Sequence, residues 1–242
     1  MSHYTLFISD LHLDPLKPRS TELFKAFMEE KAPNADALYI LGDFFEYWIG
    51  DDDRSTFNEQ IKTWLRTATQ RGLPIYLMHG NRDFLISSGF AREAGIRLIE
   101  DPTVISLYDR PTLLMHGDSL CTLDIEHQAF RRKTHHPFLC AAVLWLPLWV
   151  RRRFAQLYRQ KSQQRQATLM PTIMDVTPQE VVRIMRDKEV DLLIHGHTHH
   201  PAIHPLSLNQ TAAYRVVLGA WYEKGSALSY HSNGNIDLMS WE

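Results

Sequence analysis

Apolar runs alternate along the chain with segments whose apolar residues recur at helical spacing. Five runs are typical of buried strands, and each is followed at once by polar residues: 4–9, 37–41, 73–78, 112–115 and 191–194. Helices are predicted between these runs over Ser20–Lys31 and Ser55–Arg71, and a third begins at Thr177-Pro178-Gln179-Glu180, a capping box with proline first in the helix. Closing β-strands are predicted in 213–221, 226–231 and 235–241. Alternating strands and helices predict an α/β architecture with parallel strands.

The polar residues that follow the five strands share the ability to bind a metal ion. Ligand sites in α/β sheets lie beyond the carboxyl ends of the strands, so we expect these side chains to meet. They are Asp10, His12, Asp43, Asn81, His116, His197 and His199. Oxygen ligands mixed with imidazole suit Mn²⁺, Fe²⁺ or Zn²⁺ better than Ca²⁺. Seven ligands are too many for one ion and fit two ions, about 3.5–4 Å apart, that share a carboxylate.

The motifs around these residues resemble those of the calcineurin-like binuclear metallophosphoesterases. All five occur in the family's order: Asp10-Leu11-His12, Gly42-Asp43, Gly80-Asn81-Arg82-Asp83, His116-Gly117-Asp118 and Gly196-His197-Thr198-His199. The resemblance implies a four-layer αββα sandwich in which residues 1–242 form a single domain. It also implies how the ligands divide between the two ions. Asp10, His12, Asp43 and His199 would hold one ion, and Asp43, Asn81, His116 and His197 the other.

Charge is unevenly distributed, although the net charge is only −2. Residues 127–174 contain nine of the 26 Lys and Arg residues and none of the 28 Asp and Glu residues, so this segment carries +9 and the remainder −11. An acidic body with one basic segment predicts a localised anionic partner: lipid, nucleic acid or polyphosphate.

Residues of about 123–174 are interpreted as a helical insert that forms a cap. Its apolar run, 138–150, is too short to cross a bilayer as a helix and is flanked by basic clusters, Arg151–Arg153 among them. This pattern fits a helix lying in a membrane interface, where each basic side chain adds about 1 kcal/mol of attraction to anionic lipid. A cap whose apolar face packs against the body has the same pattern, and both interpretations can hold together.

The cysteines and the N-terminus bear on the cellular compartment. Cys121 and Cys140 are the only cysteines, which indicates a reducing compartment. The first residues, MSHYTLFISDLH, lack the basic region and cleavage site of a signal peptide. We therefore expect a cytoplasmic protein.

With the insert included, the chain from Leu6 to Trp221 is similar to the UDP-2,3-diacylglucosamine diphosphatase family, peripheral enzymes of lipid A biosynthesis. The specific stretches are ALYILGDFFEYWIGDDD, HGNRDFL, HGDSLCTLD, QAFR, IMDV, HGHTHHPA and AYRVVLGAW. The resemblance implies that water attacks the α-phosphorus of UDP-2,3-diacylglucosamine, giving UMP and 2,3-diacylglucosamine 1-phosphate (lipid X). It implies two divalent ions, with Mn²⁺ expected, and peripheral binding to the cytoplasmic leaflet of the inner membrane.

The same resemblance maps substrate contacts onto this chain. They fall at Asn81, Arg82, Asp124, Ser162, Gln166 and His197. The family has asparagine and lysine where this chain has Gln166 and Leu169. A leucine cannot supply the charge of a lysine, so either Arg165 or Lys161 compensates or the contact is lost.

The catalytic residues are expected to be Asp43, Asn81 and Arg82. Many members of the superfamily have histidine in place of Arg82, and that histidine can protonate a departing alkoxide. A phosphate leaving group has a second pKa of about 6 and leaves without such a proton. It needs charge neutralisation, which a planar guanidinium provides bidentately, so Arg82 favours pyrophosphate cleavage.

The same motifs also fit other functions. One is a metallophosphoesterase that acts on a soluble nucleotide or a nucleic-acid phosphodiester. The apolar run 138–150 suits acyl chains better than bases, so no nucleic-acid partner is expected. Another is a scaffold without activity on the same fold, but such a protein should have lost ligands, and all seven are present.

Overall fold

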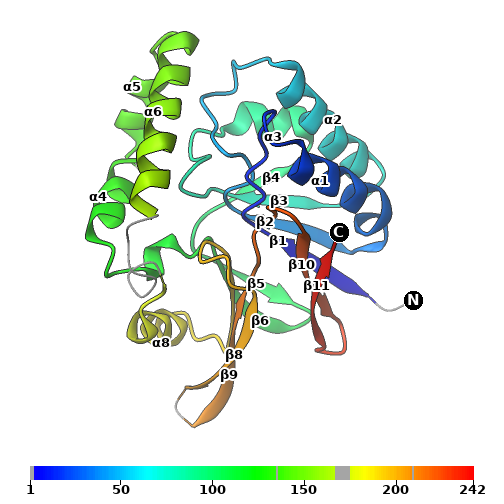
Figure 1. Ribbon diagram of the computed structural model, residues 1–242. Coiled ribbons are helices and arrows are strands. Elements are labelled where there is room, and N and C mark those ends of the chain that lie inside the picture. Colours follow the sequence, from blue (N-terminus) through cyan, green and yellow to red (C-terminus); the bar gives the residue numbers. More distant parts are fainter. Residues whose placement is uncertain (1–2, 135, 167–174, 209) are drawn as a thin grey trace.

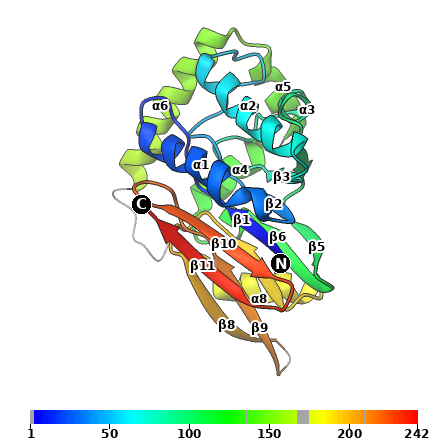
Figure 2. The same ribbon diagram turned by 90° about the vertical axis from the view of Figure 1, so that its right-hand side faces the viewer.

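The computed structural model describes residues 3–134, 136–166, 175–208 and 210–242, and within them two β-sheets lie between layers of helix (Figures 1 and 2). The first sheet has six strands. In spatial order they are β11 (Ile236–Trp241), β10 (Gly225–His231), β1 (Tyr4–Ile8), β2 (Ala37–Leu41), β3 (Ile75–Met78) and β4 (Arg97–Ile99). Strands β1 to β4 are parallel, whereas β10 and β11 join as antiparallel neighbours. The predicted parallel arrangement is therefore confirmed for the strands that precede the motifs.

The second sheet has five strands, of which the central three are parallel. In spatial order they are β5 (Thr103–Leu107), β6 (Arg110–Met115), β7 (Leu192–His195), β9 (Thr211–Val217) and β8 (Ala202–Leu208). The edge strands β5 and β8 are antiparallel to their neighbours. Consequently the carboxyl ends of β6 and β7 point the same way, which brings the two histidine motifs together.

Helices cover the outer faces of both sheets. The first sheet is covered by α1 (Pro18–Glu30), α2 (Thr56–Gln70) and α3 (Ser88–Ala94), and the second by α8 (Pro178–Asp187). Short 3₁₀ turns occupy Ala32–Asn34 and Asp118–Leu120. The predicted helices agree with α1, α2 and α8 to within a few residues.

Each of the three interfaces between these layers has its own buried cluster. Phe24 and Phe27 of α1 pack on the first sheet. Phe7 and Ile194 belong to the cluster between the sheets, and Met185 of α8 packs against the second sheet. Three apolar interfaces separate four layers, so the predicted αββα sandwich is confirmed.

One detail of the predicted α8 start is wrong. Thr177 precedes the helix and Pro178 is its first residue, but the Thr177 side chain makes no capping hydrogen bond. Its hydroxyl instead lies 2.6 Å from the hydroxyl of Thr122, just before the insert. The Thr177 hydroxyl thus contacts Thr122, which is distant in sequence, in place of the backbone of its own helix.

The insert is helical over its described residues, as predicted. It contains α4 (Ile125–Thr134), α5 (Pro137–Leu144) and α6 (Leu148–Gln166), which stand beside the sandwich (Figure 1). Within the described residues, no helix combines the length and apolar character needed to cross a bilayer.

Two arginines of the predicted lipid-facing cluster bind the body instead. Arg151 is buried and donates hydrogen bonds to the carbonyl of Ile49 and to Asp52, with Nη1 2.8 Å from Asp52 Oδ1. Arg152 Nη2 lies 2.8 Å from Asp53 Oδ1. The start of α6 is thus fastened to the acidic loop that follows β2 by two ion pairs.

Candidate metal centre

The seven predicted ligands lie in loops at the carboxyl ends of strands from both sheets. Asp10 and His12 follow β1, Asp43 follows β2 and Asn81 follows β3, all in the first sheet. The histidines at 116, 197 and 199 follow β6 and β7 of the second sheet. Two contacts join the sheets directly. His116 Nε2 lies 3.1 Å from Asn81 Oδ1, and His199 Nε2 lies 3.2 Å from Asp10 Oδ1.

Asp43 lies between two histidines of this group. Its Oδ2 is 4.0 Å from His12 Nε2, and its Oδ1 is 3.8 Å from His116 Nε2. Asp10 contributes to two compact sets of ligand atoms, one with His12 and His199 and one with Asp43 and His116. The carboxylate of Asp43 therefore presents a separate oxygen to each of two histidines, the arrangement a bridging ligand needs.

The backbone of these loops is held in an uncommon conformation. Five of the seven residues have positive φ: Asp10 (54°), His12 (48°), Asp43 (49°), His197 (68°) and His199 (61°). This left-handed region is unfavourable for residues with a side chain and persists only where the surroundings enforce it. Strain gathered in one set of loops indicates that their geometry serves function rather than stability.

Two motif glycines are required by close approach to the carboxylates. A Cβ on Gly80 would overlap the backbone nitrogen and Oδ1 of Asp43. A Cβ on Gly196 would overlap Oδ2 of Asp10. Both glycines therefore let a neighbouring loop lie directly against a predicted ligand.

Buried negative charge perturbs the titration of the centre. Burial raises the pKa of Asp43 to about 7, even though His116 and Arg82 favour its ionised form. Burial by itself would lower the pKa of His116, but Asp43, Asp118 and Asp10 outweigh it and raise that pKa to about 9. The Asp43 shift comes chiefly from burial and the His116 shift from the carboxylates around it, and bound cations would stabilise those carboxylates in their ionised form.

The donor atoms fit divalent cations. His116 Nδ1 lies 2.9 Å from the carbonyl of Leu41, which can only accept, so Nδ1 carries a proton, and Nε2 lies toward Asp43. Loss of the Nε2 proton would leave the lone pair of that nitrogen for a cation. His12 Nε2 faces Asp43 as well, and its buried Nδ1 has no hydrogen-bond partner among the described residues. Carboxylate, amide and imidazole donors without a thiolate suit Mn²⁺-like ions.

Buried acids outside the ligand set hold the loops in place. Asp83 accepts hydrogen bonds from the backbone nitrogens of Phe44 and Gly80, each at 2.7 Å, and so ties the loops that carry Asp43 and Asn81. Asp83 thus holds the loops of two predicted ligands against each other.

A second support was missed by sequence reasoning. Arg131 of α4 donates from Nε to both oxygens of Asp118 at 3.1 Å, and from Nη2 to Asp101 Oδ2 at 2.8 Å. The backbone nitrogen of His116 lies 3.4 Å from Asp101 Oδ1. Through Asp101, the insert residue Arg131 is therefore linked to the loop that carries the predicted ligand His116. Asp118 ends the HGD motif and Arg131 ends the QAFR stretch, but no feature of the sequence indicates that these two residues form a pair.

Arg82 lies inside the centre. Its backbone nitrogen donates to Asp43 Oδ1 at 3.0 Å, and its Nε lies 3.6 Å from Asp43 Oδ2. Its Nη1 donates to Glu46 Oε1 at 2.9 Å. The side chain is 9% exposed. A nearly buried guanidinium therefore places a permanent positive charge beside Asp43.

The other predicted substrate contacts are placed differently. Asp124 is buried, and its Oδ1 accepts from the backbone nitrogen of His127 at 3.0 Å, which caps the start of α4. The His197 ring lies 5.1 Å from that of His116, within the centre. Ser162 is half-buried on α6. The side chain of Gln166, and Leu169, lie outside the described residues.

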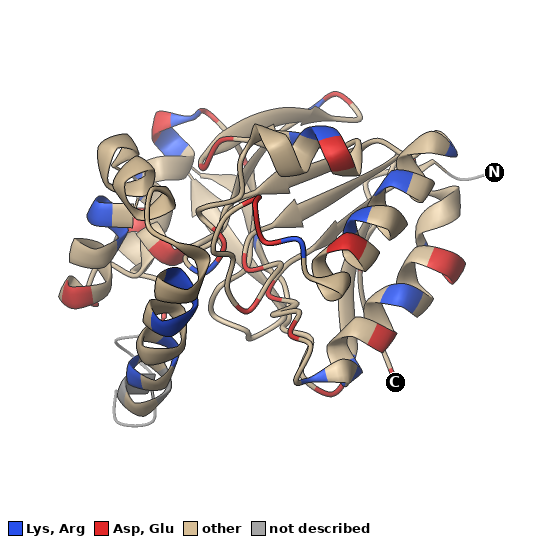
Figure 3. Ribbon diagram, turned by 90° about the horizontal axis from the view of Figure 1, so that it is seen from above, with Lys and Arg blue, Asp and Glu red and all other residues tan. Residues whose placement is uncertain are grey.

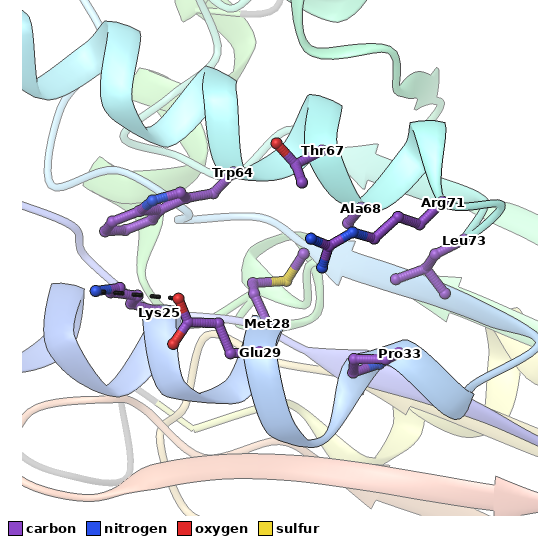
Figure 4. A pocket seen from close by; sticks show the side chains of 9 residues that line it. All are labelled: Lys25, Met28, Glu29, Pro33, Trp64, Thr67, Ala68, Arg71 and Leu73. Atoms are coloured by element: carbon purple, nitrogen blue, oxygen red, sulfur yellow. Dashed lines mark ion pairs between the residues drawn. The ribbon is translucent and has the colours of Figure 1, made fainter.

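A separate hollow lies between α1 and α2, with an open volume of about 150 Å³. The exposed ion pair between Lys25 and Glu29 lines one side of it, opposite Trp64 (Figure 4). None of the predicted ligands or substrate contacts lines this hollow. The hollow is therefore not part of the candidate metal centre.

The fold and the centre agree with a family match. The model of the calcineurin-like phosphoesterases matches residues 3–201. The chain belongs to the calcineurin-like phosphoesterase family, whose members use divalent metal ions.

Curated relatives narrow the similarity further. The chain is 52% identical over 239 residues to a UDP-2,3-diacylglucosamine hydrolase of Coxiella burnetii, covering 99% of this chain and 98% of the relative. It is 50% identical to a protein of the same name from Stenotrophomonas maltophilia, covering 98% and 99%. It is also 50% identical to a UDP-2,3-diacylglucosamine hydrolase of Pseudomonas aeruginosa, and the match covers 95% of this chain and 96% of that relative.

Gly80→Ala is predicted to impair hydrolysis without unfolding the protein. The added Cβ must displace Asp43, and misplacing a reacting group by about 1 Å costs about 100-fold in rate. Turnover of bis(p-nitrophenyl) phosphate with Mn²⁺ measures the loss. The control is Gly72→Ala in the turn after α2, where the Cβ meets nothing within 4 Å and a φ of 100° adds backbone strain only away from the centre. Equal rates for Gly80→Ala and Gly72→Ala would contradict this view of the loops.

Proposed function

We propose that this chain hydrolyses the pyrophosphate bond of UDP-2,3-diacylglucosamine, with water attacking the α-phosphorus. The products are UMP and 2,3-diacylglucosamine 1-phosphate, and the pathway is lipid A biosynthesis. The observation that carries this proposal is identity of 52% over nearly the full length, insert included, to a hydrolase named for that substrate. A shared metal centre alone supports only phosphoester hydrolysis.

We assign the ligands in two groups that share one carboxylate. Asp10, His12 and His199 serve one ion and Asn81, His116 and His197 the other, with Asp43 common to both; the positions of the Asp43 oxygens support this division. Mn²⁺ is the proposed ion. When bound, two such cations make water more acidic and neutralise charge on the phosphate oxygens.

Arg82 is the proposed clamp for the leaving phosphate. Its guanidinium lies beside Asp43, and it carries a permanent charge in a site shielded from water. Negative charge grows on the leaving phosphate oxygen as the pyrophosphate bond breaks, and a preorganised cation stabilises that charge without reorganising. Asn81 and His197 lie on the same side of the centre and are assigned both to an ion and to the substrate.

The insert is the proposed binding surface for acyl chains and membrane. Large apolar side chains stay exposed on α5, on α6 and between them, including Phe138, Trp149 and Trp145, with Trp145 90% exposed. Lys and Arg recur along α6, whereas acidic residues line loops of the body (Figure 3). Exposed tryptophans beside basic residues favour peripheral binding to an anionic bilayer, here the cytoplasmic leaflet of the inner membrane.

Release of UMP from UDP-2,3-diacylglucosamine in ¹⁸O-labelled water tests the reaction. We expect Mn²⁺-dependent turnover with the label in UMP, because water attacks the α-phosphorus. Asp43→Ala should be inactive even in excess Mn²⁺, because it removes the carboxylate between the two histidines. Label in the lipid product would refute α-attack. A protein that hydrolyses soluble diesters but not this lipid would refute the substrate.

Vesicle binding tests the role of the insert. The double variant Trp145→Ala/Trp149→Ala should bind phosphatidylglycerol-containing vesicles more than about tenfold more weakly, because each buried aromatic side chain contributes about 1.5–3 kcal/mol. Ile203→Ala, an exposed apolar residue of β8, is the control and should bind like the wild type. Equal binding by all three proteins in a sedimentation assay would remove the membrane proposal.

A further inference from the structure

Glu46 is a buried acid at the meeting point of three basic side chains. It follows Asp43 by three residues and is 5% exposed. Its Oε1 accepts from Arg82 Nη1 at 2.9 Å and lies 3.2 Å from Arg159 Nε. Its Oε2 lies 3.9 Å from Lys17 Nζ. One carboxylate therefore contacts both the proposed phosphate clamp and a residue of the insert.

Arg159 comes from α6 and is 18% exposed. Besides Glu46, it contacts a second buried acid, with Nη1 2.9 Å from Asp14 Oδ2. The middle of α6 is thus anchored in the body by two carboxylates, beyond the pairs that Arg151 and Arg152 make near its start. Of these anchors, Glu46 is the one that also touches Arg82.

The shared oxygen has an electrostatic consequence. Two guanidinium groups that bind one carboxylate oxygen lie close to each other, and the negative charge between them offsets their repulsion. Without that charge, the two cations would separate, and Arg82 would leave its position beside Asp43. Burial makes the effect larger, because water cannot screen it.

We propose that Glu46 is a positioning residue that holds the Arg82 guanidinium beside Asp43 and links its position to the docking of α6 through Arg159. The inference rests on the proposed function in one respect, that Arg82 binds the leaving phosphate. Glu46 is not one of the seven proposed ligands, and it acts through another side chain. Its Oε2 is 4.0 Å from His12 Nδ1, beyond hydrogen-bond distance, so Arg82 is the route by which it acts.

A double-mutant cycle tests the proposal. Glu46→Gln keeps the shape and removes the charge, and we expect kcat for UMP release to fall about 10- to 100-fold, as for partners that orient a functional group. In the Arg82→Ala background the same change should have no further effect, because its target is gone. Glu46→Asp, which keeps the charge, should retain more activity than Glu46→Gln.

Asp14→Asn is the matched control. It weakens the anchor of Arg159 and leaves the pair between Glu46 and Arg82 intact, so its loss of kcat should be smaller than that of Glu46→Gln. Equal losses would show that insert docking alone matters and would overturn the role of Arg82. Multiplicative effects of Glu46→Gln and Arg82→Ala would likewise overturn the proposal.

Backbone amide exchange in the metal-free protein gives a readout independent of turnover. Glu46→Gln should speed exchange in α6 around Arg159, and unchanged exchange would refute the link to the insert. If the wild type releases no UMP, the proposed substrate is wrong. The cycle is then run with a soluble pyrophosphate diester such as UDP-glucose, whose cleavage also releases a phosphate leaving group for Arg82 to bind.

Discussion

The position of the Asp43 carboxylate is the constraint on which the centre depends. Its two oxygens face His12 and His116, which come from different sheets. The close approach of Gly80 and the backbone nitrogen of Arg82 fix it from one side. Its pKa of about 7 indicates that the buried carboxylates need positive charge to stay ionised together. The fold brings the carboxyl ends of parallel strands from two sheets together and so gathers these carboxylates, which creates the need for cations.

The charge asymmetry of the chain has a structural explanation as well as a functional one. Four arginines of the basic insert bind acids of the body: Arg131 with Asp101 and Asp118, Arg151 with Asp52, Arg152 with Asp53, and Arg159 with Asp14 and Glu46. Part of the positive charge therefore docks the insert beside the centre. The exposed tryptophans of the insert belong to the surface that we propose for lipid.

The strands before the motifs were predictable because they are buried, apolar and each followed by a distinctive polar turn. Strands β4, β5 and β8 were not predicted. β4 has three residues, and β5 and β8 are edge strands whose alternating burial is a weaker signal than a continuous apolar run. The convergence of the seven motif residues was also predictable, since parallel strands end at one edge.

The contacts behind the motif residues were not predictable, because they join residues far apart in sequence. Glu46 pairs with Arg159 of the insert, and Arg131 pairs with Asp101 across 30 positions. No local pattern specifies such a pair, which exists only after the insert has folded onto the body. For the same reason, Arg151 and Arg152 looked like lipid-binding residues until their acidic partners were placed beside them.

We propose that Asp43 bridges two cations, and anomalous diffraction from crystals grown with Mn²⁺ tests this bridge directly. We expect two peaks about 3.5–4 Å apart. One should lie among Asp10, His12 and His199 and one among Asn81, His116 and His197, with an oxygen of Asp43 bound to each. A single peak, or two peaks of which only one is bound by Asp43, would contradict it.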